Sequence, residues 1–557
     1  MSDSPATPSP RPCFIASWRM SLVLALGALA LKGFGAEVGY LTIHGARDWE
    51  RGYRLLHGLG GFWHGPEKSD GTVIPGFFFN LLTGLFQLGG RGIWPAAAGP
   101  AILFAASVLL LHDALRRALK PWPALAGAAL YATFPLGTLA MRYLWNPSYL
   151  FLFLVLAVYG VSRAVHERRG NFLALSLASA LLATQLHATA WFLVGGIALA
   201  AAGARLCPTW KWLAVVVALH AAFIVPHYVA ESARDWPTAN NFTPHPPDEP
   251  PLNARLSAAP APNLFWCLGR QVFTPNPASR ENAPWTFSYD EWRLQDGTPV
   301  FKGLAWAASA LSLPLGLLCL WGWIAALKAG GPRRALALHA IGIAVPLVAF
   351  FWLWAPDGGT GARANLHLRY FFVLWPLQFI GVALALEDLA ARRPAWWRWI
   401  GAWAAVATLV FALHGLRFMQ EARRDGRPFQ YLHYTGVVVF SLRDQMDVAR
   451  FLVEEHGVTE ATMRTHVHSP ATMWFVAEQS LTYPMRAALD SAGEVAPFDA
   501  GTYFYVTRSE WEPFLEGDFE ELDRRVFGSL AVVVFRPGAP LPEGWVPDYP
   551  VDVYFDR

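Results

Sequence analysis

The first stretch of this sequence that could do chemistry follows an apolar run and reads IHGARDWERGYRLLHG, residues 43–58. It places the two carboxylates of Asp48 and Glu50 among three arginines and two aromatic side chains. A carboxylate in such a setting can take a proton from an acceptor group, and guanidinium groups bind phosphate. The same pattern is typical of an amphipathic helix at a membrane interface, with its arginines at the lipid headgroups.

Three interpretations of this stretch stay open on the residues alone. Trp49 and Tyr53 recur at helical spacing, which favours a purely interfacial helix. Alternatively, Asp48 forms a structural ion pair with Arg47 or Arg51. The aspartate side chain is too short to reach far toward water, however, and this favours a role for Asp48 in chemistry.

The composition predicts the class of protein. Of 557 residues, 54% are hydrophobic and 15% are charged, whereas a soluble domain averages roughly a quarter charged residues. This indicates a polytopic membrane protein with a soluble appendage. The net charge of +3 does not indicate a nucleic-acid partner. The four cysteines lie far apart, so the sequence predicts neither a disulfide framework nor a zinc site.

Five loops rich in lysine and arginine set the predicted topology. Short cytoplasmic loops carry an excess of these residues, so we place all five on the cytoplasmic side together with the N-terminal tail, residues 1–19. The apolar segments between them then predict a domain of about eleven membrane spans, residues 20–420. The five loops are residues 112–120, 164–170, 204–212, 327–334 and 386–399.

Two outer loops of the predicted topology are long. The first, residues 41–93, contains the apolar segment 75–90, which is short for a crossing and would invert every later loop if it crossed. We therefore expect a juxtamembrane or re-entrant helix there. The second long outer loop, residues 229–300, is rich in proline, asparagine and tryptophan.

The composition changes after residue 420, and residues 421–557 predict a soluble extracytoplasmic α/β domain. Residues 442–457 have helical periodicity and stop at a glycine. Residues 501–508 and 529–536 are rich in β-branched and aromatic residues, as strands are. This region has no glycine-rich phosphate loop and no nucleophile motif, so we assign it no catalytic role.

The polar residues of the membrane region gather in the outer loops, the side where we expect function. Ionisable groups at membrane depth are costly and tend to be functional. Two of these residues also have ordinary structural interpretations: Asn146 as a helix N-cap before Pro147, and His187 as a hydrogen-bonding partner between helices. The candidates beyond residues 43–58 are Glu67, Arg142, Asn146, His187, Glu231, His367, Arg369 and Tyr370.

Several stretches, taken in order, resemble the GT-C superfamily of integral-membrane glycosyltransferases. The resemblance is strongest to the bacterial branch related to protein O-mannosyltransferases and the lipid A aminoarabinose transferase, and it covers most of residues 20–420. The stretches are DWERGYRLLHG and HGPEKSDGTVIPGFFFNLL in the first outer loop, then FPLGTLAMRYLWNPSYLFLFLVLAVYG, ATQLHATAWFL, IVPHYVAE and LHLRYFFVLWP.

The resemblance implies transfer of a sugar from a polyprenyl-phosphate carrier to an acceptor hydroxyl or amine, with inversion. The acceptor is a glycan, a lipid or a protein. The family's first-loop acid falls on Asp48, the expected general base, with Glu50 as the alternative because Trp49 replaces the family's second acid. The remaining assignments follow the same resemblance: Arg369, Arg142, Arg51, His367 and Tyr370 for the lipid phosphate, and Glu231, Asn146, His187 and Glu67 for the substrates.

The resemblance also implies a place in the cell and leaves one cofactor question open. We expect a multi-pass protein of the cell inner (plasma) membrane, in contact with membrane lipid, with its C-terminal domain outside the cytoplasm. The outer loop at residues 141–148 contains LWNPS and lacks the carboxylate that many relatives have there. No metal site is therefore predicted, and a divalent metal stays an alternative.

A transporter or flippase for a lipid-linked or polar substrate is the main competing function. Transporters place ionisable residues and broken helices near the middle of the bilayer, often in two related halves. Here the polar clusters lie at one interface and no halves repeat, which favours chemistry at the outer surface. A non-catalytic assembly protein and a glycan polymerase or ligase are further alternatives.

Overall fold

The computed structural model covers most of the membrane region and much of the C-terminal domain. The residues it describes are 17–39, 43–60, 63, 65–66, 74–142, 144, 146–232, 298–354, 372–425, 441–468, 481–509, 518–539 and 541. Most of the predicted N-terminal tail, 1–19, and most of the predicted loop 229–300 lie outside these residues.

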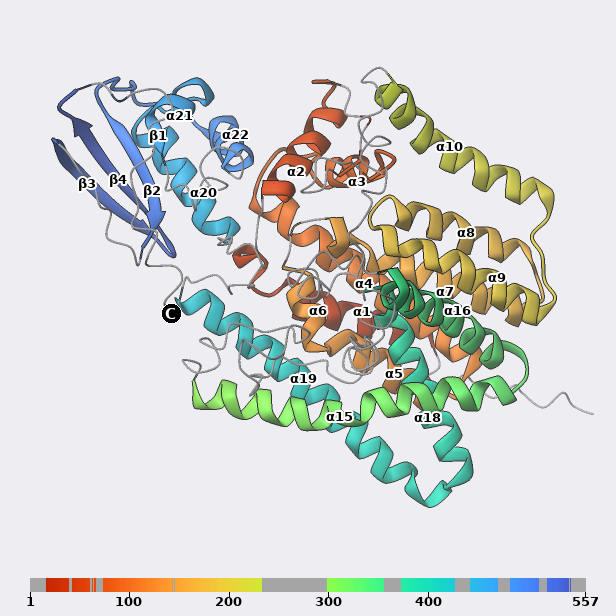
Figure 1. Ribbon diagram of the computed structural model, residues 1–557. Coiled ribbons are helices and arrows are strands. Elements are labelled where there is room, and N and C mark those ends of the chain that lie inside the picture. The colour runs from red at the N-terminus through yellow and green to blue at the C-terminus, as the bar shows by residue number, and fades with distance from the viewer. Residues whose placement is uncertain are drawn as a thin grey trace, which may run out of the picture.

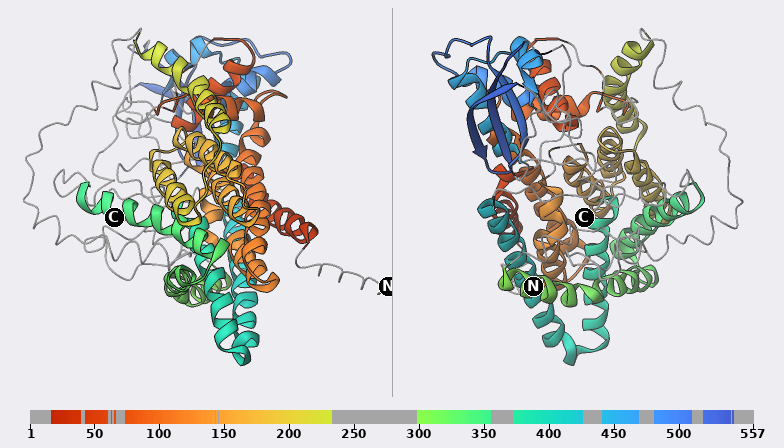
Figure 2. Two further views of the ribbon diagram at one scale, coloured as in Figure 1. Left: turned by 90° about the vertical axis from the view of Figure 1, so that its right-hand side faces the viewer. Right: turned by 60° about the vertical axis from the view of Figure 1, so that its left-hand side comes forward.

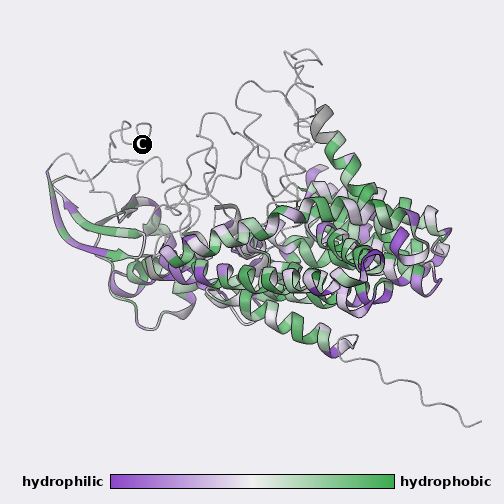
Figure 3. Cartoon of the chain, turned by 90° about the horizontal axis from the view of Figure 1, so that it is seen from below, coloured by the Kyte–Doolittle hydropathy of each residue, from purple (hydrophilic) through white to green (hydrophobic). Residues whose placement is uncertain are grey.

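A bundle of apolar helices forms the membrane region (Figure 1; Figure 3). Among the described residues, seven helices are long and apolar enough to cross a membrane. The predicted multi-pass helical architecture is therefore confirmed, while the number of about eleven spans stays a prediction. The bundle helices are α1 (Trp18–Gly33), α4 (Ile93–Ala118), α5 (Pro121–Thr133), α7 (Phe151–His166), α8 (Asn171–Thr184), α9 (Phe192–Ala204), α10 (Trp210–Ser232), α15 (Pro299–Lys328), α16 (Gly331–Trp354), α18 (Trp375–Arg392) and α19 (Trp397–Asp425).

Serine hydroxyls join neighbouring helices inside this bundle. Ser162 of α7 donates to the carbonyl of Ala114 in α4 at 2.9 Å. Ser176 of α8 donates to the carbonyl of Ala157 in α7 at 2.8 Å. Small residues and interhelical hydrogen bonds are the usual means of helix association in lipid, where burying apolar surface gains little.

Three of the predicted cytoplasmic loops meet around one buried carboxylate, Glu387. The Arg333 guanidinium donates to this carboxylate at 2.7 Å and to the carbonyl of Ala118 at 3.1 Å. The backbone N–H of Lys120 donates to the same carboxylate at 3.0 Å. The first, fourth and fifth basic loops therefore lie together at one end of the bundle.

The other two basic loops join the same end. The Arg117 guanidinium lies 3.6 Å from the Glu167 carboxylate, which ties the first basic loop to the second. Arg168 then donates to the carbonyl of Ala204 at 3.4 Å, which ties the second to the third. The shared location of all five loops, which we call the basic end, agrees with the predicted placement of these loops on one side of the membrane.

Short helices gather at the opposite end, which we call the α2 end. The helix α3 has nine residues, about 13 Å at 1.5 Å per residue. This is too short to cross a hydrocarbon layer of about 30 Å, as the sequence predicted for segment 75–90. The short elements are η2 (Ala36–Val38), α2 (Ile43–Leu56), α3 (Phe78–Phe86), α6 (Pro135–Ala140), η3 (Asn146–Tyr149) and η4 (Ala188–Trp191).

Two glycines, Gly52 of α2 and Gly84 of α3, let these helices approach each other closely. A Cβ atom placed on Gly52 would lie 2.7 Å from both the Asn80 carbonyl oxygen and the Gly84 backbone nitrogen. Real Cβ atoms do not come so near, so only glycine fits at this crossing.

The C-terminal domain is a small four-stranded sheet covered on one side by helices, as the predicted α/β class requires. The strand order is β1-β2-β4-β3, with β1 and β2 parallel and the other pairs antiparallel. The predicted helix 442–457 begins as α20 and continues as the π-helical turn η8. The elements are α20 (Leu442–Arg450), η8 (Phe451–Glu455), α21 (Glu460–His466), β1 (Val467–His468), α22 (Thr482–Ser491), β2 (Tyr503–Arg508), β3 (Phe519–Phe527) and β4 (Leu530–Pro537).

This domain docks on the α2 end of the bundle, away from the α18–α19 turn (Figure 2). The backbone N–H of Leu442, at the start of α20, donates to the carbonyl of Gly39 at 2.7 Å. The helix α22 packs against α2. The first outer loop and the last domain of the chain therefore share one interface.

Candidate active site

The carboxylate of Asp48 is buried on α2, with 1% of the residue exposed. Its Oδ1 atom lies 3.3 Å from Nε of Arg47 and 3.9 Å from Nη1 of Arg51. Arg47 precedes Asp48 directly in the sequence and Arg51 follows one helical turn later, and the three side chains lie together in the structure. A buried carboxylate between two guanidinium groups can both accept a proton and lie close to a bound phosphate.

The helix α3 supports the backbone of α2 directly beneath Asp48. The Thr83 hydroxyl oxygen lies 3.4 Å from the Asp48 carbonyl oxygen, and the Gln87 amide donates to the Trp49 carbonyl at 2.8 Å. Both are buried polar side chains of the juxtamembrane helix. The segment that the sequence predicted as a juxtamembrane or re-entrant helix therefore contacts the candidate catalytic helix.

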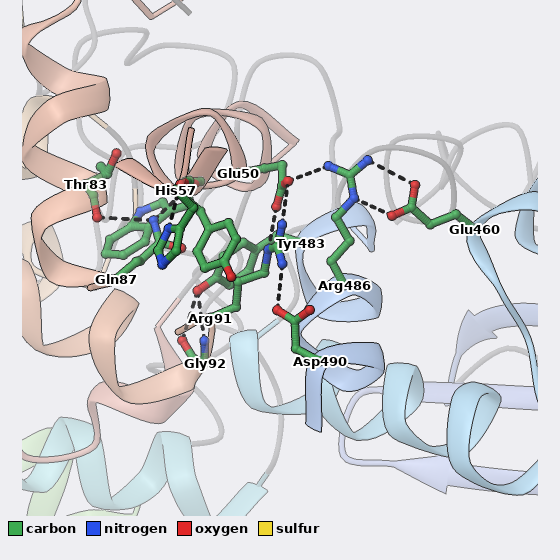
Figure 4. Close-up of polar contacts among 12 residues, drawn as sticks. Glu50, His57, Thr83, Gln87, Arg91, Gly92, Glu460, Tyr483, Arg486 and Asp490 are labelled. Carbon is green, nitrogen blue, oxygen red and sulfur yellow. Dashed lines mark hydrogen bonds and ion pairs between the residues drawn. The ribbon is translucent and has the colours of Figure 1, made fainter. Parts of the chain in front are cut away.

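Glu50 lies in a cluster of charges at the boundary with the C-terminal domain (Figure 4). The Arg91 guanidinium binds both Glu50 oxygens, at 2.8 and 2.9 Å. Nη1 of Arg486 lies 2.5 Å from Oε1 of Glu50, and Arg91 also binds Asp490 at 2.6 Å. Sequence reasoning missed both arginines, because nothing local links them to Glu50.

The ion pairs keep these arginines firmly charged. Burial lowers the pKa of the Arg91 guanidinium, but hydrogen bonds to Glu50 and Asp490 outweigh burial and raise it. The hydrogen bond to Glu460 is the largest cause of the raised pKa of Arg486. Both guanidinium groups therefore stay charged across the physiological pH range.

Tyr483 of α22 adds a second link between the two regions. Its hydroxyl donates to the carbonyl of Gly92 at 3.1 Å and accepts from the N–H of Gly92 at 3.0 Å. Burial raises the pKa of this phenol, so its proton stays available for the first of these bonds.

Trp49 does not face the membrane interface, and the interfacial role considered for it is wrong. Its side chain is fully buried. Its ring lies 6.2 Å from the Tyr149 ring and 6.2 Å from the Tyr483 ring, between η3 and α22. Sequence periodicity marked the apolar face of α2 correctly, but this face packs on protein.

Two other predicted outer loops, residues 141–148 and 184–189, converge near the start of α3. The Asn146 amide donates to the carbonyl of Leu186. The Phe78 backbone N–H donates to the buried Gln185 side chain at 3.3 Å. His187, two residues later, is buried and contacts the Thr189 hydroxyl at 2.8 Å. These two loops therefore meet the first outer loop, as the predicted topology requires.

Glu231 is buried in the last turn of α10. Two turns earlier, the Phe223 ring lies 5.2 Å from the Phe77 ring and 5.3 Å from the Phe78 ring. This aromatic contact brings the α10 end that carries Glu231 toward the first outer loop.

Arg142 is also buried, and it links two helices of the bundle. Its guanidinium donates to the carbonyl of Phe34 at 2.6 Å and contacts the Met419 sulfur at 3.3 Å. It therefore joins the end of α1 to α19. Four other predicted site residues lie outside the described residues: Glu67, His367, Arg369 and Tyr370. Within the described part of the chain, no group of three or more His, Cys, Asp or Glu side chains is arranged to hold a metal ion.

Comparison with known proteins supports the resemblance drawn from the sequence. Residues 73–229, from the segment before α3 to α10, match the family model described as dolichyl-phosphate-mannose-protein mannosyltransferase. A search of curated proteins finds no match.

Solved structures give the fold. ArnT from Cupriavidus metallidurans bound to undecaprenyl phosphate aligns with a TM-score of 0.51 at 13% identity, over 92% of this chain and 97% of that chain. Its apo form aligns with a TM-score of 0.50 at 11% identity, over the same shares of the two chains. The predicted resemblance is thus confirmed at the level of fold: this chain has the architecture of the GT-C membrane glycosyltransferases.

Proposed function

We propose that this protein is a glycosyltransferase that moves a sugar from a polyprenyl-phosphate carrier to a hydroxyl or amine of an acceptor. The observation that carries the proposal is the buried Asp48 carboxylate, held between two arginines at the end of the bundle opposite the basic loops. The family match and the fold shared with ArnT support it.

In this proposal Asp48 is the general base. The acceptor hydroxyl or amine attacks the anomeric carbon and passes its proton to the Asp48 carboxylate. The bond between that carbon and the phosphate oxygen breaks, and the polyprenyl phosphate leaves with the bonding electrons. Attack on the face opposite the leaving group inverts the configuration at the anomeric carbon.

Asp48 suits this role better than Glu50. Both Glu50 oxygens already accept hydrogen bonds from Arg91, and one also contacts Arg486. The Glu50 carboxylate therefore serves the contact with the C-terminal domain. The contacts of Asp48 with Arg47 and Arg51 are longer, at 3.3 and 3.9 Å.

The departing phosphate needs fixed positive charge, which guanidinium groups supply in a two-pronged geometry. Among the residues that the structure describes, Arg51 is the candidate for binding this phosphate, since it lies one helical turn from Asp48. Arg369, with His367 and Tyr370, is the second candidate from the sequence. Arg142 is a weaker candidate, because its guanidinium binds Phe34 and Met419.

Glu231 and His187 are our candidates for contacts with the sugar or the acceptor. Both are buried polar residues at the α2 end, and polar groups at such depth tend to be functional. Asn146 and Glu67 belong to the same proposal on the basis of the sequence. The lipid chain is expected along α10, where the side chains of Val225 and Val229 are exposed close to the aromatic contact with α3.

The positive-inside rule orients the reaction. Because the five basic loops meet at one end, we propose that this end faces the cytoplasm. The α2 end and the C-terminal domain then face the outside of the inner membrane, where the acceptor is modified.

The test uses membranes containing the full chain and a panel of undecaprenyl phosphates that carry radiolabelled hexoses or pentoses. We expect Asp48→Asn to lower transfer of label by a factor of about 10²–10⁴, the usual contribution of a general base. The matched control is Asp499→Asn, at a side chain that is 61% exposed in the C-terminal domain. Near-normal turnover of a folded Asp48→Asn protein would rule out Asp48 as the base. Movement of the intact donor across the vesicle membrane, without formation of a new glycosidic bond, would instead support the alternative function as a transporter or flippase.

A further inference from the structure

The helix α2 presents its two carboxylates to opposite sides. Successive residues of an α-helix are about 100° apart around its axis, so Asp48 and Glu50 point about 160° apart. Glu50 faces the C-terminal domain (Figure 4), which leaves Asp48 on the far side of the helix. One side of α2 is therefore an attachment surface, and the other side carries the proposed base.

The attachment side is held by two arginines that each bridge two carboxylates. Arg486 of α22 contacts Glu50 at 2.5 Å and binds Glu460 through Nη2 at 3.0 Å. Arg91 binds Glu50 and Asp490, and its guanidinium lies 3.6 Å from the centre of the Tyr53 ring. Glu50 and Tyr53 are one turn apart on the same side of α2, so the grip extends over a full turn.

The Arg91–Glu50 pair is almost completely buried. The side chains of Arg91 and Glu50 are 7% and 8% exposed. Charge-assisted bonds in such surroundings are strong and directional, and removing one partner of a buried pair is costly because the other charge stays buried. The cluster therefore resists rotation of α2 about its axis.

We propose that the C-terminal domain sets the rotation of α2 and thereby positions Asp48, with Arg486 as the positioning residue that acts through Glu50. This inference rests on the proposed function of Asp48. A helix side chain ends about 5 Å from the axis, so a 20° rotation moves its carboxylate by about 2 Å. A misplacement of about 1 Å can cost about 10²-fold in rate.

The alternative is that α3 alone fixes α2. Thr83 and Gln87 contact carbonyl oxygens of α2 at Asp48 and Trp49, and the close crossing at Gly52 leaves little room for sliding. If these contacts suffice, Arg486 contributes only to docking of the domain, and its loss leaves the catalytic step unchanged.

The experiment compares Arg486→Gln with Arg524→Gln in the full chain. Arg524 lies in the same domain and forms an exposed pair with Glu521 at 2.9 Å on β3. With the labelled undecaprenyl-phosphate sugar that the wild type uses, we expect Arg486→Gln to lower kcat by roughly tenfold or more. Donor KM should change little, because the base acts mainly in the transition state. The control should keep both constants. Wild-type kcat in folded Arg486→Gln would overturn the inference.

A double-mutant cycle with Glu50→Gln identifies the route of the effect. If Arg486 acts through Glu50, the kcat of the double variant should be no lower than the kcat of the less active single variant. Additive losses would overturn the inference, as would loss of activity in Glu50→Gln but not in Arg486→Gln. The Asp48→Asn result is independent: a dead Asp48→Asn with a normal Arg486→Gln removes the positioning role and keeps the proposed function.

Two further measurements keep the outcome decisive. Hydrogen exchange of the α2 amides should rise in Arg486→Gln and stay unchanged in Arg524→Gln, whichever sugar is the substrate. If Arg486→Gln does not fold, Arg486→Lys keeps the charge but cannot bridge Glu50 and Glu460 in the same geometry. Its kcat should fall several-fold with donor KM retained, and an unchanged kcat would contradict the inference.

Discussion

At the basic end of the bundle, the Glu387 carboxylate pairs with an arginine that remains partly exposed, whereas at the α2 end both members of the Arg91–Glu50 pair are buried. The Arg333 side chain, which binds Glu387, is 38% exposed. At the other end, the side chains of Arg91 and Glu50 are each less than 10% exposed. The first pair joins loops within the membrane region, and the second lies where that region meets the C-terminal domain.

The difference shows that the same chemical pair serves two purposes. Ion pairs in contact with water contribute roughly 0–1 kcal/mol, so partly exposed pairs at the basic end such as Arg117–Glu167 mainly keep loops in place. Buried pairs are costly to break, by about 3–5 kcal/mol when one partner is removed. The pairs at the α2 end can therefore hold a whole domain in a fixed orientation.

Arg91→Gln should have the largest effect on this comparison. Glutamine leaves Glu50 and Asp490 without their shared cation and removes the stack on Tyr53, so we expect docking of the C-terminal domain to lose about 3 kcal/mol or more. Hydrogen exchange in α22, measured on the full chain, is the readout. Unchanged protection of α22 would mean that the buried pair does not hold the domain.

Gly52→Ala should have an intermediate effect and separates packing from charge at the α2 end. The added methyl would meet the backbone of α3, and overpacking of this kind costs about 1–3 kcal/mol. Thermal unfolding in detergent measures the loss. Gly27→Ala in α1 is the matched control, because a Cβ there meets no atom within 4 Å. Equal midpoints for the two variants would show that α3 yields to the methyl group.

Arg117→Gln should have the smallest effect. Arg117 pairs with Asp113 at 2.8 Å and Glu167 at 3.6 Å, but its side chain is partly exposed and Asp113 keeps Arg116 as a partner. We expect the free energy of unfolding to change by less than about 1 kcal/mol. A loss as large as that of Arg91→Gln would abolish the distinction between the two ends.

Much of the fold could be predicted because lipid imposes simple rules. Apolar segments about 20 residues long predict spans, and the excess of basic residues in some loops predicts their shared side. The contacts of Arg333, Arg117 and Arg168 between these loops agree with that prediction. Segment 75–90 was excluded as a span by its length and by the inversion of every later loop that a crossing would cause, and its helix is indeed short.

The contacts around α2 were less predictable, because they join residues far apart in the sequence. Helical spacing marked Asp48 and its arginines as neighbours, but it gave no sign that Glu50 faces α22. Periodicity identified the apolar side of α2 without distinguishing lipid from protein, so Trp49 was misplaced. The edge strand β3 was missed because its residues are mostly charged and exposed, unlike the buried residues of β4.

The cluster around Glu50 also has a consequence for the timing of synthesis. Arg91 and Asp490 are separated by 399 residues. A ribosome adding about 5–20 residues per second needs roughly 20–80 s to travel between them. During that interval α2 is already in place without its partner domain. The complete arrangement around α2 can therefore form only after the C-terminal domain has been synthesised.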